Sequence, residues 1–317
     1  MENIIIDTDL GYDCDDGGAL AIANKLHETK KINLMAVTHC VNKAAGGSAI
    51  RKINGYYRHE DISVGIAERY AIDADRLYED FYQKLRYRKD FKGFPVKPSF
   101  YRLLREAIGV NEKTTEKFES ACSVILKKLE ESKDYDTTLV CIGQMNNFAD
   151  LISGNGEFLR KKIKRAVVMC GNFKQQGEYY DDGETLWYGE FNILLDKESA
   201  KTVFAAKDFP VDILDYNVGC DILTGSGLTG QEDNPVYKMY KLHGKGRECP
   251  SWDPIALLYA SGLYDECFET GAYGTVNVSE KGKTVFAEGE GKHRLISVKE
   301  DKKEYLRNVI NGIFKES

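Results

Sequence analysis

The chain has 317 residues, of which 42% are hydrophobic and 30% charged, and its formal net charge is -6 at pH 7. This composition is that of an ordinary folded protein, and no apolar run approaches the roughly 20 residues that a membrane-spanning helix needs. The negative net charge argues against general affinity for nucleic acid or for an anionic membrane. We therefore expect no nucleic-acid partner and no membrane partner.

Short runs of β-branched and other apolar residues alternate with helical patterns along the chain. Strands are expected at residues 4–6, 32–38, 62–66, 139–142, 166–170 and 211–214. Helices are expected at residues 115–131 and 301–314, with helical insertions within residues 73–109 and a hairpin of residues 275–278 and 284–287. Alternating strands and helices are typical of α/β proteins. We predict an open, mostly parallel sheet flanked by helices, with helical insertions and a small C-terminal hairpin.

Expectations about the number of domains and the cellular compartment come from the prolines, the cysteines and the start of the first strand. It contains only 6 prolines, and we find no repeat and no linker, which favours a single domain over residues 1–317. Its 8 cysteines include no Cys-x-x-Cys pair, and several fall in apolar runs, as reduced core cysteines do. Because the first strand is expected to begin at residue 3, we also expect no signal peptide and a cytoplasmic location.

Five aspartates follow the first predicted strand within ten residues: Asp7, Asp9, Asp13, Asp15 and Asp16. In open α/β sheets, ligands bind beyond the carboxyl ends of the parallel strands. Carboxylates crowded at such a point repel one another unless a cation or dense hydrogen bonding compensates them. A turn followed by a helix N-cap is the structural alternative, but capping needs only one Asp. The cluster therefore indicates a metal or catalytic site.

The segment Asp7-Thr8-Asp9-Leu10-Gly11, followed by Asp15 and Asp16, resembles the first motif of the inosine-uridine preferring nucleoside hydrolases. Further motifs of that family are matched in order by residues 143–147, 168–171, 190–193 and 252–254. The resemblance extends over about residues 3 to 260. It implies Ca²⁺-dependent hydrolysis of the N-glycosidic bond of a ribonucleoside or related N-riboside, and relatives that are often dimers or tetramers make a homo-oligomer a further expectation.

The resemblance also implies a role for individual residues. The Ca²⁺ ligands would be Asp9, Asp16 and Asp253, together with the backbone carbonyl of Asn146. Asp9 would in addition accept the proton of the attacking water. The substrate-binding residues would be Asp15, Asn42, Met169, Glu190, Asn192 and Trp252. For Asn42, a role in stabilising its own loop is an equal alternative.

Two departures from the family pattern concern substrate choice. The loop before Asp15 is two residues longer than in the best-known members, which leaves the role of Asp13 open. Trp252 stands where purine- and pyrimidine-cleaving members commonly have histidine, and an indole cannot readily protonate a leaving base, although it can stack on one. His243 is the candidate leaving-group acid, with a solvated loop histidine as the alternative, and His39 is a second candidate for the pocket. Tyr179, Tyr180, Trp187 and Tyr188 are expected to form an aromatic lid.

Two other functions compete with this one. Haloacid dehalogenase-type phosphatases also open with a strand followed by Asp-x-Asp, but here the residue four after Asp7 is Gly11 instead of a hydroxyl residue. A non-catalytic, Ca²⁺-dependent nucleoside- or ribose-binding protein stays open because of Trp252.

Overall fold

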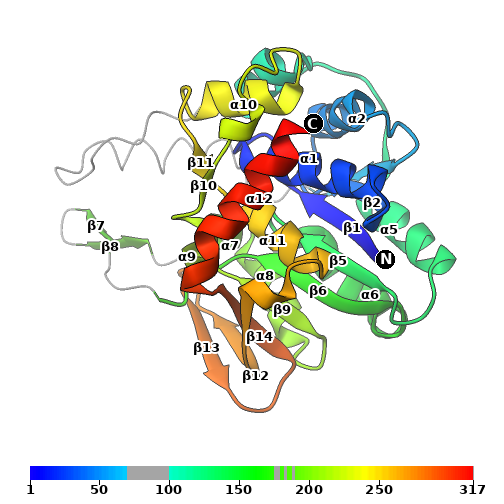
Figure 1. The fold of residues 1–317 in the computed structure, drawn as a ribbon. Coiled ribbons are helices and arrows are strands. Elements are labelled where there is room, and N and C mark those ends of the chain that lie inside the picture. The colour runs from blue at the N-terminus through cyan, green and yellow to red at the C-terminus, as the bar shows by residue number, and fades with distance from the viewer. Residues whose placement is uncertain (70–99, 175–178, 182–183, 188–189, 317) are drawn as a thin grey trace.

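The computed structural model describes residues 1–69, 100–174, 179–181, 184–187 and 190–316 of the chain. Within these residues the dominant feature is a 10-stranded sheet with the order β13-β12-β14-β9-β6-β5-β1-β2-β3-β4 (Figure 1). All neighbours from β14 to β4 pair in parallel, and only β12 pairs antiparallel, with β13 and β14. The prediction of an open, mostly parallel sheet is confirmed.

The strands of this sheet are β1 (Glu2–Thr8), β2 (Ile32–His39), β3 (Ser63–Ile66), β4 (Glu119–Ser120), β5 (Thr137–Cys141), β6 (Ile163–Met169), β9 (Val211–Leu214), β12 (Phe268–Val278), β13 (Thr284–Glu288) and β14 (His293–Val298). Two short antiparallel pairs lie outside it: β7 (Tyr179–Asp181) with β8 (Glu184–Trp187), and β10 (Leu223–Thr224) with β11 (Cys249–Pro250).

Helices cover both faces of the sheet: α1 (Asp15–Glu28), α2 (Ala44–Tyr56), α4 (Phe100–Leu103), α5 (Ala121–Glu131), α6 (Asn146–Lys162), α7 (Phe191–Leu195), α8 (Lys197–Ala205), α9 (Tyr216–Gly219), α10 (Pro235–His243), α11 (Trp252–Ser261) and α12 (Lys303–Lys315). Successive side chains of β1 alternate between two apolar clusters. Ile4 and Ile6 pack with residues of α1 and α11, whereas Ile5 packs with residues of α5 and α6. Burial on both faces explains why the strands read as continuous apolar runs instead of alternating ones.

The predicted elements are found with shifted boundaries. The helix expected at 115–131 begins only at Ala121, because Ser120 caps it by accepting a hydrogen bond from the Ser123 amide and the preceding two residues pair with β3. The predicted hairpin is the β12–β13 pair, but β12 is longer than expected and belongs to the main sheet through β14, which the sequence reading missed. Of the expected insertions within 73–109, residues 70–99 lie outside the described part. In the described residues, no helix is both long and apolar enough to cross a membrane.

Candidate active site

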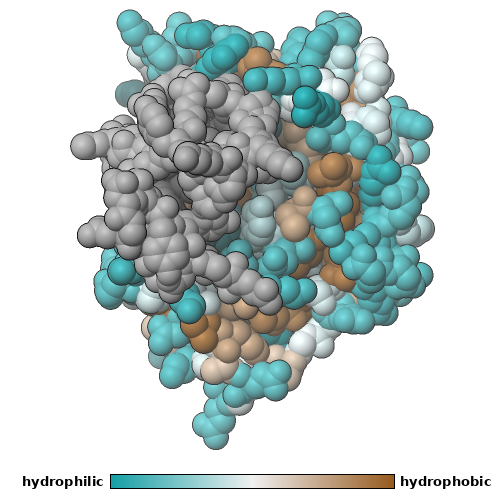
Figure 2. All heavy atoms as spheres, turned by 90° about the vertical axis from the view of Figure 1, so that its left-hand side faces the viewer, coloured by the Kyte–Doolittle hydropathy of each residue, from teal (hydrophilic) through white to brown (hydrophobic). Residues whose placement is uncertain are grey.

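The predicted site residues gather where the central parallel strands end. At this edge, Thr8 of β1 is in register with His39 of β2, and Asp7 with Cys141 of β5. The loops that begin at residues 9, 40 and 142 therefore start side by side, as expected for a ligand site in an open α/β sheet. β1 runs toward the left of Figure 1, and Figure 2 looks onto that side. There the described surface is mixed, with hydrophobic areas among hydrophilic ones.

Three buried carboxylates form the centre of the site. Asp15 and Asp16 lie in the first turn of α1 and Asp253 in the first turn of α11, and each is at most 5% exposed. One oxygen from each lies within 4.8 Å of the other two. The Asp253 amide also donates a hydrogen bond of 3.2 Å to Asp15 Oδ2. Both helices thus direct their N-termini, which favour negative charge, at the same point.

Asp9 joins this cluster from the loop after β1. It is 4% exposed, and burial raises the pKa of its carboxyl to about 7, with the charges of Glu190 and Asp13 adding to the effect. Burial, followed by the charges of neighbouring aspartates, also holds the pKa values of Asp16 and Asp253 well above their usual range. Thr8 Oγ1 donates a hydrogen bond to Asp16. Such a set of buried carboxylates is fully ionised at neutral pH only with a compensating positive charge, and its hard oxygen donors fit a divalent cation such as Ca²⁺.

Asp7 points elsewhere, although it begins the same motif. Its Oδ1 accepts hydrogen bonds from Thr38 Oγ1 at 2.6 Å and from Asn147 Nδ2 at 2.9 Å. Burial raises the pKa of Asp7 to about 6. Asp7 is therefore a buried polar contact between β1, β2 and α6, separate from the carboxylates around Asp16.

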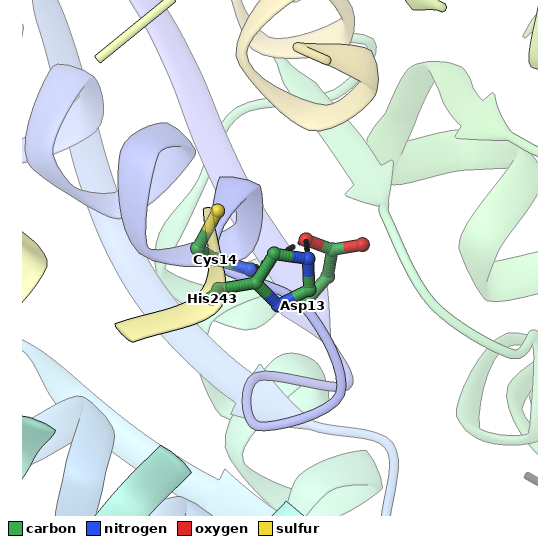
Figure 3. A group of neighbouring side chains, drawn as sticks. All are labelled: Asp13, Cys14 and His243. Carbon is green, nitrogen blue, oxygen red and sulfur yellow. Dashed lines mark hydrogen bonds and ion pairs between the residues drawn. The ribbon is translucent and has the colours of Figure 1, made fainter. Parts of the chain in front are cut away.

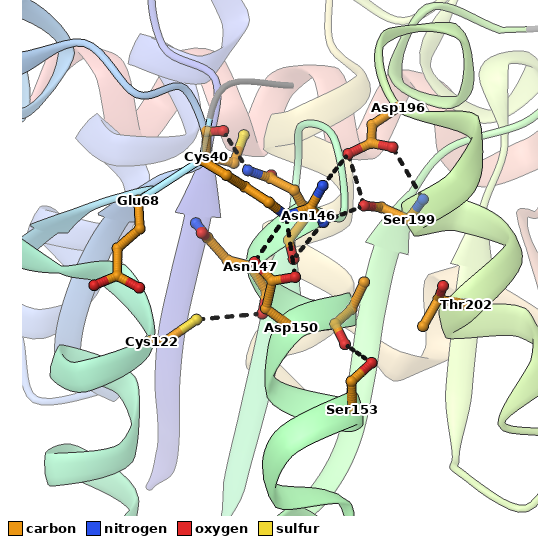
Figure 4. Close-up of polar contacts among 12 residues, drawn as sticks. Cys40, Glu68, Cys122, Asn146, Asn147, Asp150, Ser153, Asp196, Ser199 and Thr202 are labelled. Carbon is orange, nitrogen blue, oxygen red and sulfur yellow. Dashed lines mark hydrogen bonds and ion pairs between the residues drawn. The ribbon is translucent and has the colours of Figure 1, made fainter. Parts of the chain in front are cut away.

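Asn146 is the first residue of α6 and lies in a buried polar network (Figure 4). Its side-chain Nδ2 donates to Cys40 O at 2.9 Å, and its backbone carbonyl accepts a hydrogen bond of 3.5 Å from Arg69 Nη2. Its Oδ1 is buried and has no hydrogen-bond partner within the described part of the chain. Asn146 thus offers an uncommitted amide oxygen, while the carbonyl expected to bind the metal contacts Arg69. Arg69 also bridges to Asp150, Asp196 and Ser199, a network that sequence reasoning missed because it depends on how α6 packs against α8.

Glu190, Asn192 and Met169 lie together at the end of β6. The Glu190 carboxylate caps α7 and accepts hydrogen bonds from the amides of Gly171, Asn192 and Ile193. Burial raises its pKa to about 7. Asn192 Nδ2 donates to the Met169 carbonyl at 3.0 Å. The charge of Glu190 raises the pKa of Asp9, so these three residues lie next to the carboxylate cluster.

Asn42 and Trp252 make contacts of their own. Asn42 Nδ2 donates to the Glu68 carbonyl at 2.5 Å, which joins the loops after β2 and β3 and supports the loop-stabilising alternative. The Trp252 Nε1 donates to the Tyr216 carbonyl at 2.8 Å, and the two rings lie 5.5 Å apart with an interplanar angle of 30°. The indole N–H of Trp252 is therefore already engaged.

His243 is the last residue of α10 and is only 8% exposed, so the alternative of a solvated loop histidine is wrong. Its Nε2 lies 3.1 Å from Asp13 Oδ1 (Figure 3). The sequence did carry a signal for this helix: Asn234 before Pro235 is a cap followed by proline at the first helical position. Of the predicted aromatic lid, Tyr188 and the side chains of Tyr179, Tyr180 and Trp187 lie outside the described part.

Comparison with known proteins identifies the family of this chain. The sequence model of the family described as inosine-uridine preferring nucleoside hydrolase matches residues 4–310. The chain belongs to this family. Family membership makes it an N-ribosyl hydrolase, and the nucleoside hydrolases are metal-dependent enzymes.

Solved structures share the fold. The inosine-uridine preferring nucleoside hydrolase from Bacillus anthracis is 17% identical, with a TM-score of 0.71 and 100% of both chains covered. The purine-preferring ribonucleoside hydrolase from Gardnerella vaginalis is 19% identical, with a TM-score of 0.67 and again 100% of both chains covered. The type III effector protein XopQ, solved with adenosine diphosphate ribose, is 13% identical, with a TM-score of 0.70 and coverage of 99% of this chain and 94% of that one. No curated protein matches the chain.

Proposed function

We propose that this nucleoside hydrolase cleaves the N-glycosidic bond of a ribonucleoside or related N-riboside with Ca²⁺ held at the carboxylate cluster, releasing base and ribose. The observation that carries the proposal is the burial of Asp9, Asp16 and Asp253 together at the carboxyl edge of the sheet. Asp15 belongs to the same cluster, and in this proposal it is either a fourth carboxylate ligand or a hydrogen-bond partner of the ribose hydroxyls.

Ca²⁺ fits this donor set because it accepts six to eight oxygen ligands in flexible geometry. Asp9, Asp16 and Asp253 would hold it, and Asn146 would contribute an oxygen from its carbonyl or its amide. When bound, the cation supplies a positive charge that orients the oxygens of the sugar and of water.

Asp9 is the general base of the proposal. It takes a proton from water as the water oxygen bonds to the anomeric carbon, and the bond from that carbon to the base nitrogen breaks. A base works best when its pKa lies near the working pH; in the absence of a cation, burial raises the pKa of Asp9 to about 7, and a bound cation lowers it from there. Positive charge that develops on the sugar is stabilised by the surrounding carboxylates, as in other glycoside hydrolyses.

The ribose would lie between the carboxylate cluster and the end of β6. Glu190 is held rigidly by three backbone amides, and Asn192 is fixed by the Met169 carbonyl, so both present oriented polar groups to a sugar. A sugar diol offers donors and acceptors to such groups. Trp252 would contribute its ring face, since its N–H already binds Tyr216. Asn42 donates one N–H to the Glu68 carbonyl, so its amide oxygen or second N–H would be the group that binds a ribose hydroxyl.

His243 is the leaving-group acid of the proposal, because every other histidine is excluded by its position. His39 faces the carbonyls of Val41 and Leu10, and burial lowers its pKa to about 4. His27 and His59 contact each other at the far end of α1, about 16 Å along the helix from Asp16. His293 begins β14, at the opposite edge of the sheet. His243, in contrast, contacts the carboxylate of Asp13 in the loop that carries the site aspartates.

The decisive experiment incubates the pure protein with Ca²⁺ and a panel of purine and pyrimidine nucleosides and measures the release of reducing ribose. We expect release with at least one nucleoside, loss of it with a chelator, and a drop of about 10³-fold or more in kcat for Asp9→Asn, because an amide cannot accept the proton. In that variant calorimetry should still detect Ca²⁺ binding through the remaining ligands. Tight binding of a nucleoside without any ribose release would instead establish a non-catalytic binding protein.

A further inference from the structure

Asp13 is in contact with His243 and within electrostatic reach of the carboxylate cluster. Its charge raises the pKa values of Asp9, Asp16 and Asp253, which places it beside the reacting centre. Its own carboxylate is fixed, because Oδ1 accepts a hydrogen bond of 2.6 Å from the Cys14 amide. The same Oδ1 lies 3.1 Å from His243 Nε2. The loop from Gly11 to Cys14 therefore holds one carboxylate against the imidazole at the end of α10 (Figure 3).

We propose that Asp13 is the positioning residue of the leaving-group acid: its carboxylate accepts the Nε2–H of His243, orients the imidazole and favours its protonated form during the reaction. This inference rests on the proposed function. The side chains of His243 and Asp13 are 8% and 20% exposed, so their interaction is weakly screened by solvent. A carboxylate that fixes one ring nitrogen of a histidine determines which nitrogen is left to transfer a proton.

The proton transfers balance with this assignment. The N–H bond on the Nδ1 side of His243 breaks, and a new N–H bond forms on the departing base, which also keeps the electron pair of the broken glycosidic bond. His243 becomes neutral, and Asp9 holds the proton of the attacking water. Solvent then reprotonates His243 and removes the proton from Asp9, so the net reaction consumes one water. Asp13 itself exchanges no proton.

A structural role for the pair would give a different result from a catalytic one. If Asp13 only ties the loop to α10, its loss should displace Asp15 and Asp16, weaken Ca²⁺ binding and slow every substrate equally. If Asp13 orients the acid, its loss should slow only substrates whose leaving group needs a proton. A nitrophenolate leaves without protonation, whereas a purine or pyrimidine base is a poor leaving group unless protonated.

The experiment compares Asp13→Asn, His243→Gln and the double variant on 4-nitrophenyl riboside and on the best nucleoside substrate. For the nucleoside we expect kcat to fall about 10- to 100-fold in Asp13→Asn and about 10²-fold or more in His243→Gln, with KM changed less. For the nitrophenyl riboside we expect kcat to stay within about threefold. In the double variant, kcat should equal that of His243→Gln alone, because Asp13 acts only through the histidine.

Controls separate the outcomes. Asp13→Glu keeps a carboxylate and should recover part of the lost kcat, and His59→Gln, which changes a histidine remote from the site, should leave both rates unchanged. Ca²⁺ affinity and the melting temperature are measured for each variant. Equal losses on both substrates, additive losses in the double variant, or an unaffected Asp13→Asn would each overturn the proposal. Failure of the unmodified enzyme to cleave either substrate would refute the proposed function itself.

Discussion

Because of the carboxylate cluster, we expect Ca²⁺ to raise the stability of the fold. In the absence of Ca²⁺, we expect rising pH to lower that stability. With a chelator present, Asp9, Asp16 and Asp253 are buried without a compensating cation. Any ligand that binds only the folded state stabilises it by RT ln(1 + [L]/Kd), which is about 2.7 kcal/mol at a concentration 100 times Kd. Unfolding entropies near 2.1 cal/mol/K per residue give roughly 0.7 kcal/mol/K for a chain of 317 residues. The expected increase in melting temperature is therefore about 4 °C.

The sign of the pH dependence follows from the raised pKa values. The ordinary pKa of an Asp is 3.8, whereas in the fold the pKa of Asp9 is about 7 and those of Asp16 and Asp253 are raised well above their usual range. From about pH 4 upward the folded state therefore binds more protons than the unfolded state, and the stability of the chelated protein falls as pH rises through the pKa of about 7. Ca²⁺ binds the ionised carboxylates, so its stabilising effect grows over the same range.

Scanning calorimetry of the protein at pH 5, 6, 7 and 8, in chelator and in saturating Ca²⁺, measures both effects. The two melting curves should converge toward pH 5 and separate toward pH 8. In Asp253→Asn the increment due to Ca²⁺ should shrink or vanish, whereas Asp221→Asn, which removes an exposed ion pair with Lys303, should retain it. A chelated protein that becomes more stable from pH 5 to pH 8, or an undiminished increment in Asp253→Asn, would refute the reasoning.

Two further predictions concern positions next to the cluster. Asp7→Asn should stabilise the chelated protein by up to about 3 kcal/mol at pH 7.5 and by nearly nothing below pH 4. Burial raises the pKa of this carboxyl to about 6, and an amide avoids the cost of ionising it. Urea unfolding at both pH values measures the effect, and a gain of equal size at both would contradict the prediction. Gly219→Ala should lower both the melting temperature and the Ca²⁺ affinity. A Cβ at Gly219 would lie 2.5 Å from Trp252 Cα and would displace the start of α11, the helix that carries Asp253. Calorimetry showing unchanged Ca²⁺ affinity would mean that the position of Asp253 tolerates this displacement.

The central part of the sheet could be predicted from sequence because its strands are buried on both faces. Runs such as Ile4 to Ile6 and Ala166 to Met169 are short, apolar and separated by helical patterns, which is sufficient to indicate parallel strands. The antiparallel pairing of β12 with β14, next to the edge strand β13, was harder to predict. Most residues of β12 between Glu269 and Gly274 are exposed, so this part of the strand has no continuous apolar run to reveal it.

The positions of the aspartates were predictable only as a group. Sequence spacing placed Asp7 and Asp9 together after one strand, but the two differ in partners: Asp7 contacts Thr38 and Asn147, whereas Asp9 joins Asp16. The contact between Asp13 and His243 joins residues 230 positions apart in the chain and depends on how α10 packs beside the first loop. No local pattern records such a contact, because it arises from tertiary packing.

The number of acidic groups at the site exceeds what a divalent cation can neutralise, and this surplus has a chemical consequence. A bound cation favours the ionised form of Asp9 and so lowers its pKa, which weakens it as a base. The charge of Glu190 acts on Asp9 in the opposite direction and raises its pKa. The same negative charge stabilises a sugar that becomes positive as its base departs. If Asp9 is the general base proposed above, the Glu190 carboxylate should help to keep it basic while a cation is bound, and removing the charge of Glu190 should lower kcat even where Ca²⁺ still binds.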